Sequence, residues 1–159
     1  MVLKEIDVKS LAIAGIPLGA LVLLQRIPQL KVRVYAIGGD KKKGISEFWI
    51  AARVKNTGDV DISGWHIEMY ASGPGGVNFP LAVADISLAK GEEKRFPATD
   101  YYKKKVPENI PTGTYSAVVF VVDSPSNQPG NIVTQSRLDN AWNVIEPVRK
   151  VDITAIEVA

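Results

Sequence analysis

Cysteine is absent from the 159-residue sequence, histidine occurs once, and the formal net charge at pH 7 is only +2. Without cysteine the chain has no disulfide, no thiolate metal ligand and no cysteine nucleophile. A net charge this small does not indicate nucleic-acid binding by bulk charge. The sequence also lacks a glycine-rich phosphate loop, a histidine pair at metal-ligand spacing and a specific nucleic-acid motif. These absences argue against an enzyme, and we expect neither catalytic nor cofactor-binding residues.

The single histidine is His66, and a catalytic dyad or triad built on histidine would have to use it. In the alternating run Gly64–Tyr70 it points opposite Trp65, which we expect to be the core aromatic residue. We therefore expect His66 to be an outward-facing surface histidine without a catalytic role.

The apolar content is 46%, enough for one core, and 10 prolines and 13 glycines are spread between the apolar runs. The densest strand pattern lies between Glu47 and Val122 and begins with Phe48, Ile50, Ala52 and Val54 in alternation with more polar neighbours. Strands are predicted at 31–37, 47–55, 64–70, 79–83, 85–88, 94–96, 115–122, 132–136 and 142–145, with loops at 38–44, 99–109 and 125–130. Seven to nine short strands at this spacing predict an all-β fold, an antiparallel β-sandwich.

Several turn motifs resemble those of the CARDB-type immunoglobulin-like domains of bacterial and archaeal surface proteins. Val54–Gly58 followed by Val60 resembles the end of that family's second strand, and Ile86–Glu92 resembles its glycine–acid turn. Pro111–Tyr115 resembles the start of its sixth strand, and Asp123 stands where that strand's terminal acid falls. The family's closing acid and paired asparagines are matched only in part, by Gln135, Asp139 and Asn140.

The resemblance covers about residues 31–145 and implies an immunoglobulin-like sandwich with adhesion, spacing or assembly roles and no catalysis. We accordingly divide the chain into an N-terminal segment (1–30), a sandwich domain (31–147) and a C-terminal edge strand (148–159). Independently of the resemblance, Tyr115 at the start of a strand predicts a tyrosine corner, in which its hydroxyl bonds to upstream backbone.

The N-terminal segment contains an uninterrupted apolar run, Leu11–Leu24, expected to be helical. Acids in the leading residues and the lack of a small-residue cleavage site argue against a signal peptide. A helix over the run would be about 21 Å long, short of the roughly 30 Å hydrocarbon core. Three readings stay open: a membrane anchor over 10–25, an assembly element among subunits, and a helix packed on its own domain. The candidate anchor or assembly residues are Leu11, Ile13, Ile16, Leu18, Leu21, Leu23 and Leu24.

Two sets of loop residues are candidates for binding. Asn56, Asp59 and Asp61 are expected near Asp123 and Asn127, and their oxygens could hold calcium or could simply form turns. Two lysine triplets are expected at the opposite end of the sandwich, where they would be solvated or would contact anionic lipid, nucleic acid or an acidic subunit. We call this set the basic pole: Lys41, Lys42, Lys43, Lys103, Lys104 and Lys105.

Two functions remain open for this chain. The first is a structural subunit of a cell surface, filament or virion, anchored or assembled through the N-terminal run and partnered by other copies or neighbouring subunits. The second is a membrane-tethered module that binds a ligand with its sandwich loops. Either reading places the protein at a membrane or on an extracellular or virion surface.

Overall fold

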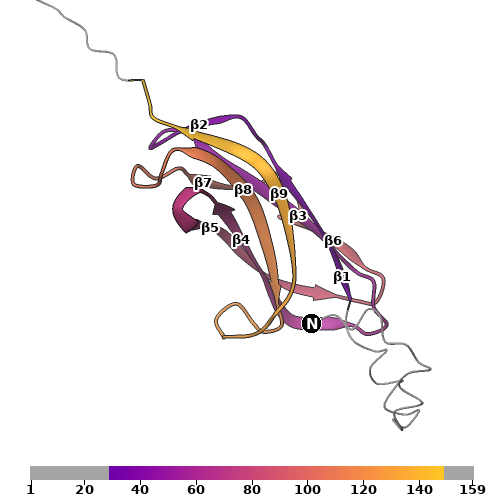
Figure 1. The fold of residues 1–159 in the computed structure, drawn as a ribbon. Coiled ribbons are helices and arrows are strands. Elements are labelled where there is room, and N and C mark those ends of the chain that lie inside the picture. The colour runs from indigo at the N-terminus through magenta and orange to yellow at the C-terminus, as the bar shows by residue number, and fades with distance from the viewer. Residues whose placement is uncertain (1–28, 149–159) are drawn as a thin grey trace, which may run out of the picture.

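The computed structural model describes residues 29–148, which form a two-layer β-sandwich (Figure 1). The elements are β1 (Leu30–Ala36), β2 (Asp40–Lys42), β3 (Glu47–Asn56), β4 (Ile62–Ser72), the short helix η1 (Pro74–Gly76), β5 (Asn78–Leu88), β6 (Glu93–Phe96), β7 (Tyr102–Lys105), β8 (Gly113–Val122) and β9 (Ile132–Ile145). The predicted all-β sandwich of seven to nine strands is confirmed.

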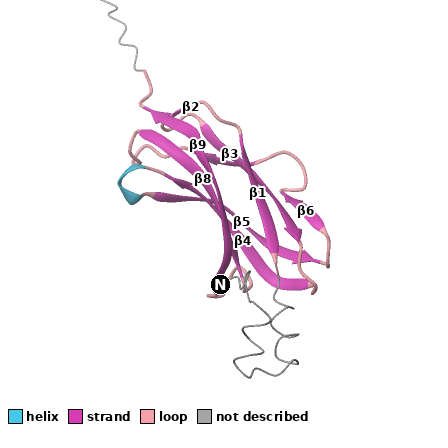
Figure 2. Ribbon diagram, turned by 45° about the vertical axis from the view of Figure 1, so that its right-hand side comes forward, coloured by secondary structure: helices cyan, strands magenta, loops and turns pink. Residues whose placement is uncertain are grey.

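The strands are divided between two sheets that face each other (Figure 2). The first sheet has the order β1–β3–β6, and β7 also pairs with β3, beyond the end of β6. The second sheet has the order β2–β9–β8–β4–β5. All pairs are antiparallel except β2–β9, which is parallel.

The alternation of β3 places its apolar side chains in the core. Phe48, Ile50 and Val54 are fully buried between the sheets, whereas Arg53 and Lys55 are exposed. This is the arrangement that a period of two requires of a strand with one solvated face. The interpretation of 47–55 as a half-buried strand is confirmed.

The aromatic centre of the core is Trp142 rather than Trp65. The Trp142 side chain is 1% exposed, its ring centroid lies 4.8 Å from that of Phe48, and its Nε1 donates to the carbonyl oxygen of Ile37 at 3.0 Å. Trp65 is only half-buried: it packs against the margin of the core and also lines a surface hollow. The prediction that Trp65 is the core aromatic was therefore wrong.

The predicted tyrosine corner is confirmed. Tyr115 is fully buried, and its hydroxyl donates to the carbonyl oxygen of Pro111 at 2.7 Å. Its ring packs so closely on Gly73 that a Cβ at this position would overlap the ring. This contact ties the start of β8 to the turn after β4.

Several predicted boundaries were wrong because long-range pairing decides them. The predicted loops 38–44 and 99–109 contain β2 and β7, which form only because β9 and β3 supply their hydrogen-bonding partners. The predicted break near Ala84 is absent, since β5 pairs with β4 along its whole length and tolerates Pro80 as an edge strand. The two strands predicted within 132–145 are one strand, β9.

The candidate anchor residues of the apolar run and the edge strand predicted for 148–159 lie outside the described residues, except for Val148. Within residues 29–148, no helix has the length and apolar character needed to cross a membrane.

Candidate functional site

The structure places both lysine triplets of the basic pole at one end of the sandwich, where β2 and β7 lie (Figure 1). Backbone hydrogen bonds join the two segments: Gly44 N donates to Val106 O at 2.7 Å, and Val106 N donates to Ser46 O at 2.9 Å. The triplets therefore form one surface, although they lie largely on short strands rather than in loops.

Acidic side chains reduce the positive charge of this surface. Lys43 Nζ lies 2.6 Å from Glu146 Oε1, and the Lys43 side chain is only 11% exposed. Burial lowers the pKa of Lys41, an effect that the negative charge of Glu47 partly opposes. Lys42, by contrast, is exposed. The β2 half of the basic pole is thus less basic than its sequence indicates.

The β7 half keeps more accessible charge. Lys104 and Lys105 are exposed, and Lys103 Nζ lies 4.2 Å from the centre of the Trp49 ring and 3.2 Å from Asp100 Oδ2. A cation over an indole face is attracted by the ring quadrupole. The Trp49 ring therefore fixes one ammonium group on this surface.

Among the calcium candidates, Asn56 already makes a full set of contacts within the protein. It is completely buried; its Nδ2 donates to Val60 O at 2.7 Å and to Leu88 O at 3.2 Å, and its Oδ1 accepts from Gly58 N at 3.0 Å. The side chain thus closes the β3–β4 turn, which is the role that asparagine plays in many turns.

Two of the aspartates contact the same residue, Lys90, and the third holds the β8–β9 loop. Asp61 Oδ1 accepts from Lys90 N at 2.8 Å, Asp59 Oδ1 lies 3.9 Å from Lys90 Nζ, and Asp123 Oδ1 accepts from Asn131 N at 2.7 Å. In the part of the chain that the structure describes, no group of three or more histidine or acidic side chains is arranged to hold a metal ion.

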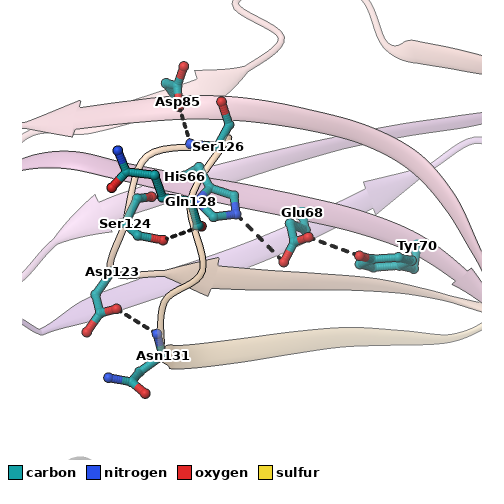
Figure 3. Close-up of polar contacts among 9 residues, drawn as sticks. All are labelled: His66, Glu68, Tyr70, Asp85, Asp123, Ser124, Ser126, Gln128 and Asn131. Carbon is teal, nitrogen blue, oxygen red and sulfur yellow. Dashed lines mark hydrogen bonds and ion pairs between the residues drawn. The ribbon is translucent and has the colours of Figure 1, made fainter.

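His66 is buried, only 4% exposed, so the prediction of a surface histidine was wrong. Its side chain lies on the outer face of the second sheet, but the β8–β9 loop folds over it (Figure 3). Nδ1 lies 2.5 Å from the carbonyl oxygen of Ser124 and must donate, since a carbonyl only accepts. Nε2 lies 3.7 Å from Glu68 Oε2, and Glu68 Oε1 accepts from the Tyr70 hydroxyl at 3.1 Å.

The polar contacts around His66 hold the β8–β9 loop (Figure 3). Ser124 Oγ donates to Gln128 O at 3.0 Å, and Ser126 N donates to Asp85 Oδ1 at 3.0 Å. Because Ser124 offers His66 its carbonyl rather than its hydroxyl, this arrangement contains no pair of nucleophile and base. These contacts serve to hold the β8–β9 loop against the second sheet.

A shallow hollow of about 400 Å³ lies beside this loop. Trp65, Asp85 and Asn127 contribute to its lining, together with Pro125 and Ser126. A half-buried indole next to amide and carboxylate groups can contact a small ligand with both apolar and polar surface.

Sequence reasoning missed the outward side chains of β1 and β3. Lys31 and Arg33 are exposed on β1, next to Arg53 and Lys55 on β3. The signal was available, because these residues occupy the polar positions of two predicted strands. It was overlooked because the net charge of the chain averages over all of its faces.

Comparison with solved structures finds a CARDB domain from Pyrococcus furiosus, a crystal structure in complex with di-metal ions. The identity is 17%, the match covers 76% of this chain and 97% of that domain, and the TM-score is 0.50. A solution structure of a CARDB domain from the same organism matches with 17% identity, 74% and 96% coverage and a TM-score of 0.48. A β-glucosidase from Listeria innocua in complex with glucose matches with 18% identity over 74% of this chain but 16% of its own, with a TM-score of 0.44.

No family model and no curated protein matches the sequence. The similarity in structure nonetheless confirms the fold predicted from the turn motifs: the described part of the chain is a CARDB-like immunoglobulin-like sandwich.

Proposed function

We propose that this protein is a non-enzymatic structural subunit of a cell surface, filament or virion, anchored or assembled through its N-terminal apolar run. The observation that carries the proposal is that the uninterrupted run Leu11–Leu24 precedes the first strand of a CARDB-like sandwich by only a few residues. An apolar run of this length is longer than soluble chains commonly leave in contact with water. Its cover would be lipid or neighbouring subunits.

We propose a function without catalysis because the polar side chains of the sandwich are engaged in structural contacts. His66 contacts Ser124 O and Glu68, and Asn56 closes a turn. These groups make contacts within the fold, and the one histidine of the sandwich meets the carbonyl rather than the hydroxyl of Ser124. The proposal includes no resident cofactor.

The proposed partners are other copies of the chain or neighbouring structural subunits. Strands β1, β2 and β5 lie at sheet edges, where a strand from another copy can add by backbone hydrogen bonds. The segment 148–159 would supply such a strand, to its own sheet or to a neighbour's. The basic pole would face an anionic surface, and the protein would lie at a membrane or on an extracellular or virion surface.

A second candidate function is a membrane-tethered module that binds a ligand with its loops. The hollow of about 400 Å³ beside Trp65 and the β8–β9 loop favours it. Deletion of residues 1–26 separates the two. It abolishes polymerisation if the chain assembles through the run, and it merely solubilises a monomer if the run is only a tether.

A further inference from the structure

Three arginines stand in one row across the first sheet. Arg33 on β1 and Arg95 on β6 are the direct cross-strand partners of Arg53 on β3, one on each side. Partners in an antiparallel pair project to the same face, and neighbouring strands are roughly 5 Å apart. Arg33 and Arg53 are exposed, whereas Val54 in the neighbouring Val32–Val54 row is fully buried. By the alternation of a strand, the arginine row therefore lies on the outer face of the sheet.

Little negative charge compensates the row. Arg53 Nη1 lies 4.0 Å from Glu93 Oε1, at the limit of an ion pair, and Arg95 Nη1 donates to the carbonyl oxygen of Pro97 at 2.9 Å. Like charges placed directly opposite each other destabilise a sheet. This sheet nevertheless holds three arginines directly opposite one another. Such an arrangement is expected where a bound anion neutralises their positive charge.

The next row continues the cationic surface. Lys31, Lys55 and Glu93 are cross-strand partners in that order. Together with Arg33 and Arg53 they line a shallow hollow of about 200 Å³. Four cations thus surround one recess, and the guanidinium fork matches the oxygens of a phosphate group bidentately.

Aromatic rings lie on the same face, about 13 Å farther along β3 at the rise per residue of a strand. The centroids of Trp49 and Tyr101 are 6.3 Å apart, with Lys103 Nζ 4.2 Å from the Trp49 ring centre and the Arg95 guanidinium 5.1 Å from that of Tyr101. Both rings are half-buried, so part of each remains accessible.

The whole outer face is strongly basic. Its outward positions on β1, β3, β6 and β7 carry two carboxylates, those of Glu47 and Glu93. They carry seven cations: Lys31, Arg33, Arg53, Lys55, Arg95, Lys103 and Lys105. The formal charge of these strand positions is therefore +5. Asp100, which lies 3.2 Å from Lys103, reduces the charge of the face to +4, still larger than the +2 of the complete chain.

We propose that the outer face of the first sheet binds single-stranded nucleic acid, with the arginine row on the phosphates and the Trp49–Tyr101 pair on a base. Cations that follow a backbone, combined with aromatic rings that stack on bases, are the means by which proteins hold single strands without sequence preference. A duplex keeps its base faces stacked inside, where these rings cannot reach them. An acidic glycan could bind the arginines through its negative charges, but it has no base to stack on the rings of Trp49 and Tyr101.

The test uses the full chain in one non-ionic detergent and a fluorescein-labelled oligothymidine of about 16 nucleotides. Fluorescence polarisation measures the Kd over a range of salt concentrations. The triple variant Arg33→Gln, Arg53→Gln, Arg95→Gln should bind at least about tenfold more weakly at low salt, and the slope of log K against log salt should fall by about 2, since each lost phosphate contact removes about 0.7. Trp49→Phe should remove most of the tryptophan quenching that the oligonucleotide causes.

The matched control is Lys90→Gln, Lys94→Gln, Arg137→Gln, which removes the same charge from outside both this face and the basic pole and should leave the Kd within about twofold. Thermal unfolding of both triple variants checks that each is folded. Equal weakening by control and face variants overturns the proposal, as does failure of oligothymidine to bind. Tighter binding of heparin or of a duplex of the same length than of oligothymidine also overturns it, in favour of an acidic glycan or of double-stranded nucleic acid.

Discussion

Arg33 on β1 and Arg53 on β3 are direct cross-strand partners, and both side chains are exposed. Their repulsion is a cost to the free protein that solvent and salt reduce but do not abolish. The outer face of the first sheet is thus less stable than its hydrogen bonding alone would make it.

Replacing Arg33 by glutamine should therefore stabilise the fold. It relieves the repulsion but keeps the contact between Arg53 and Glu93, so the free energy of unfolding should rise by about 0.2–1 kcal/mol at low ionic strength. The gain should fade as salt is raised. Chemical denaturation at low and high salt measures it, with Arg137→Gln on the other sheet as the control. A loss of stability that does not depend on salt would contradict this account.

Replacing Tyr115 by phenylalanine tests the tyrosine corner. The variant keeps the buried ring but loses the hydrogen bond to Pro111 O, so it should be less stable by about 1 kcal/mol at neutral pH. Denaturation by urea measures the loss. Tyr35→Phe, which alters a tyrosine on the outer face of the first sheet, should be nearly neutral.

The same variant has a pH signature. Burial raises the pKa of Tyr115 above its ordinary value of about 10, so the folded state holds this proton at pH values where the unfolded state has lost it. The resulting stability is fully present below pH of about 10 and is lost as the pH rises through the folded pKa. Thermal unfolding between neutral pH and about pH 11 should show a shallower alkaline decline for Tyr115→Phe than for the parent. Parallel declines would refute the assignment.

Replacing Asn56 by alanine should cost about 2–4 kcal/mol, because it leaves the buried carbonyl group of Leu88 and the partly buried one of Val60 without this donor. Asp59→Ala, in the same turn but exposed, should cost less than about 0.5 kcal/mol. If Asn56 acts through the turn, millimolar calcium should leave the unfolding temperature of the parent unchanged. A calcium-dependent rise that Asn56→Ala abolishes would show that these residues form a cation site instead.

Replacing His66 by alanine should loosen the β8–β9 loop while the sandwich stays folded. The variant removes the hydrogen bond to Ser124 O and opens space beneath the loop. Hydrogen exchange should speed up across residues 123–131, and protease should cut there first. Exchange in β3, on the other sheet, is the internal reference. Unchanged protection of the loop would mean that the contacts of Asp123 and Ser126 suffice to hold it.

The sequence predicts the sandwich well because its strongest signals are local. The alternation around Phe48 and Val54, the turn at Asn56 and the corner at Tyr115 each depend on a few neighbouring residues, and each is present in the structure. Propensity and periodicity describe such features directly.

The errors all concern contacts between distant segments. β2 and β7 exist because β9 and β3 pair with them, which no local pattern of lysines reveals. Trp142 is the central aromatic of the core because it packs on Phe48 and bonds to Ile37 O, both about 100 residues away in sequence. His66 is covered by a loop almost 60 residues away. The polar positions of the basic face are visible in the predicted strands, but only the pairing of β1, β3 and β6 brings Arg33, Arg53 and Arg95 into one row.

The central claim is that the apolar run 11–24 anchors or assembles the sandwich, and assembly with other copies is the part that a mass measurement decides. Size-exclusion chromatography with light scattering tests it most directly, on the full chain and on a chain lacking residues 1–26, both in the same mild detergent. The account predicts that the full chain has a mass that is a multiple of the 17.2 kDa monomer and that the truncated chain is a folded monomer. A truncated chain that still assembles, or a full chain that is monomeric, would contradict it.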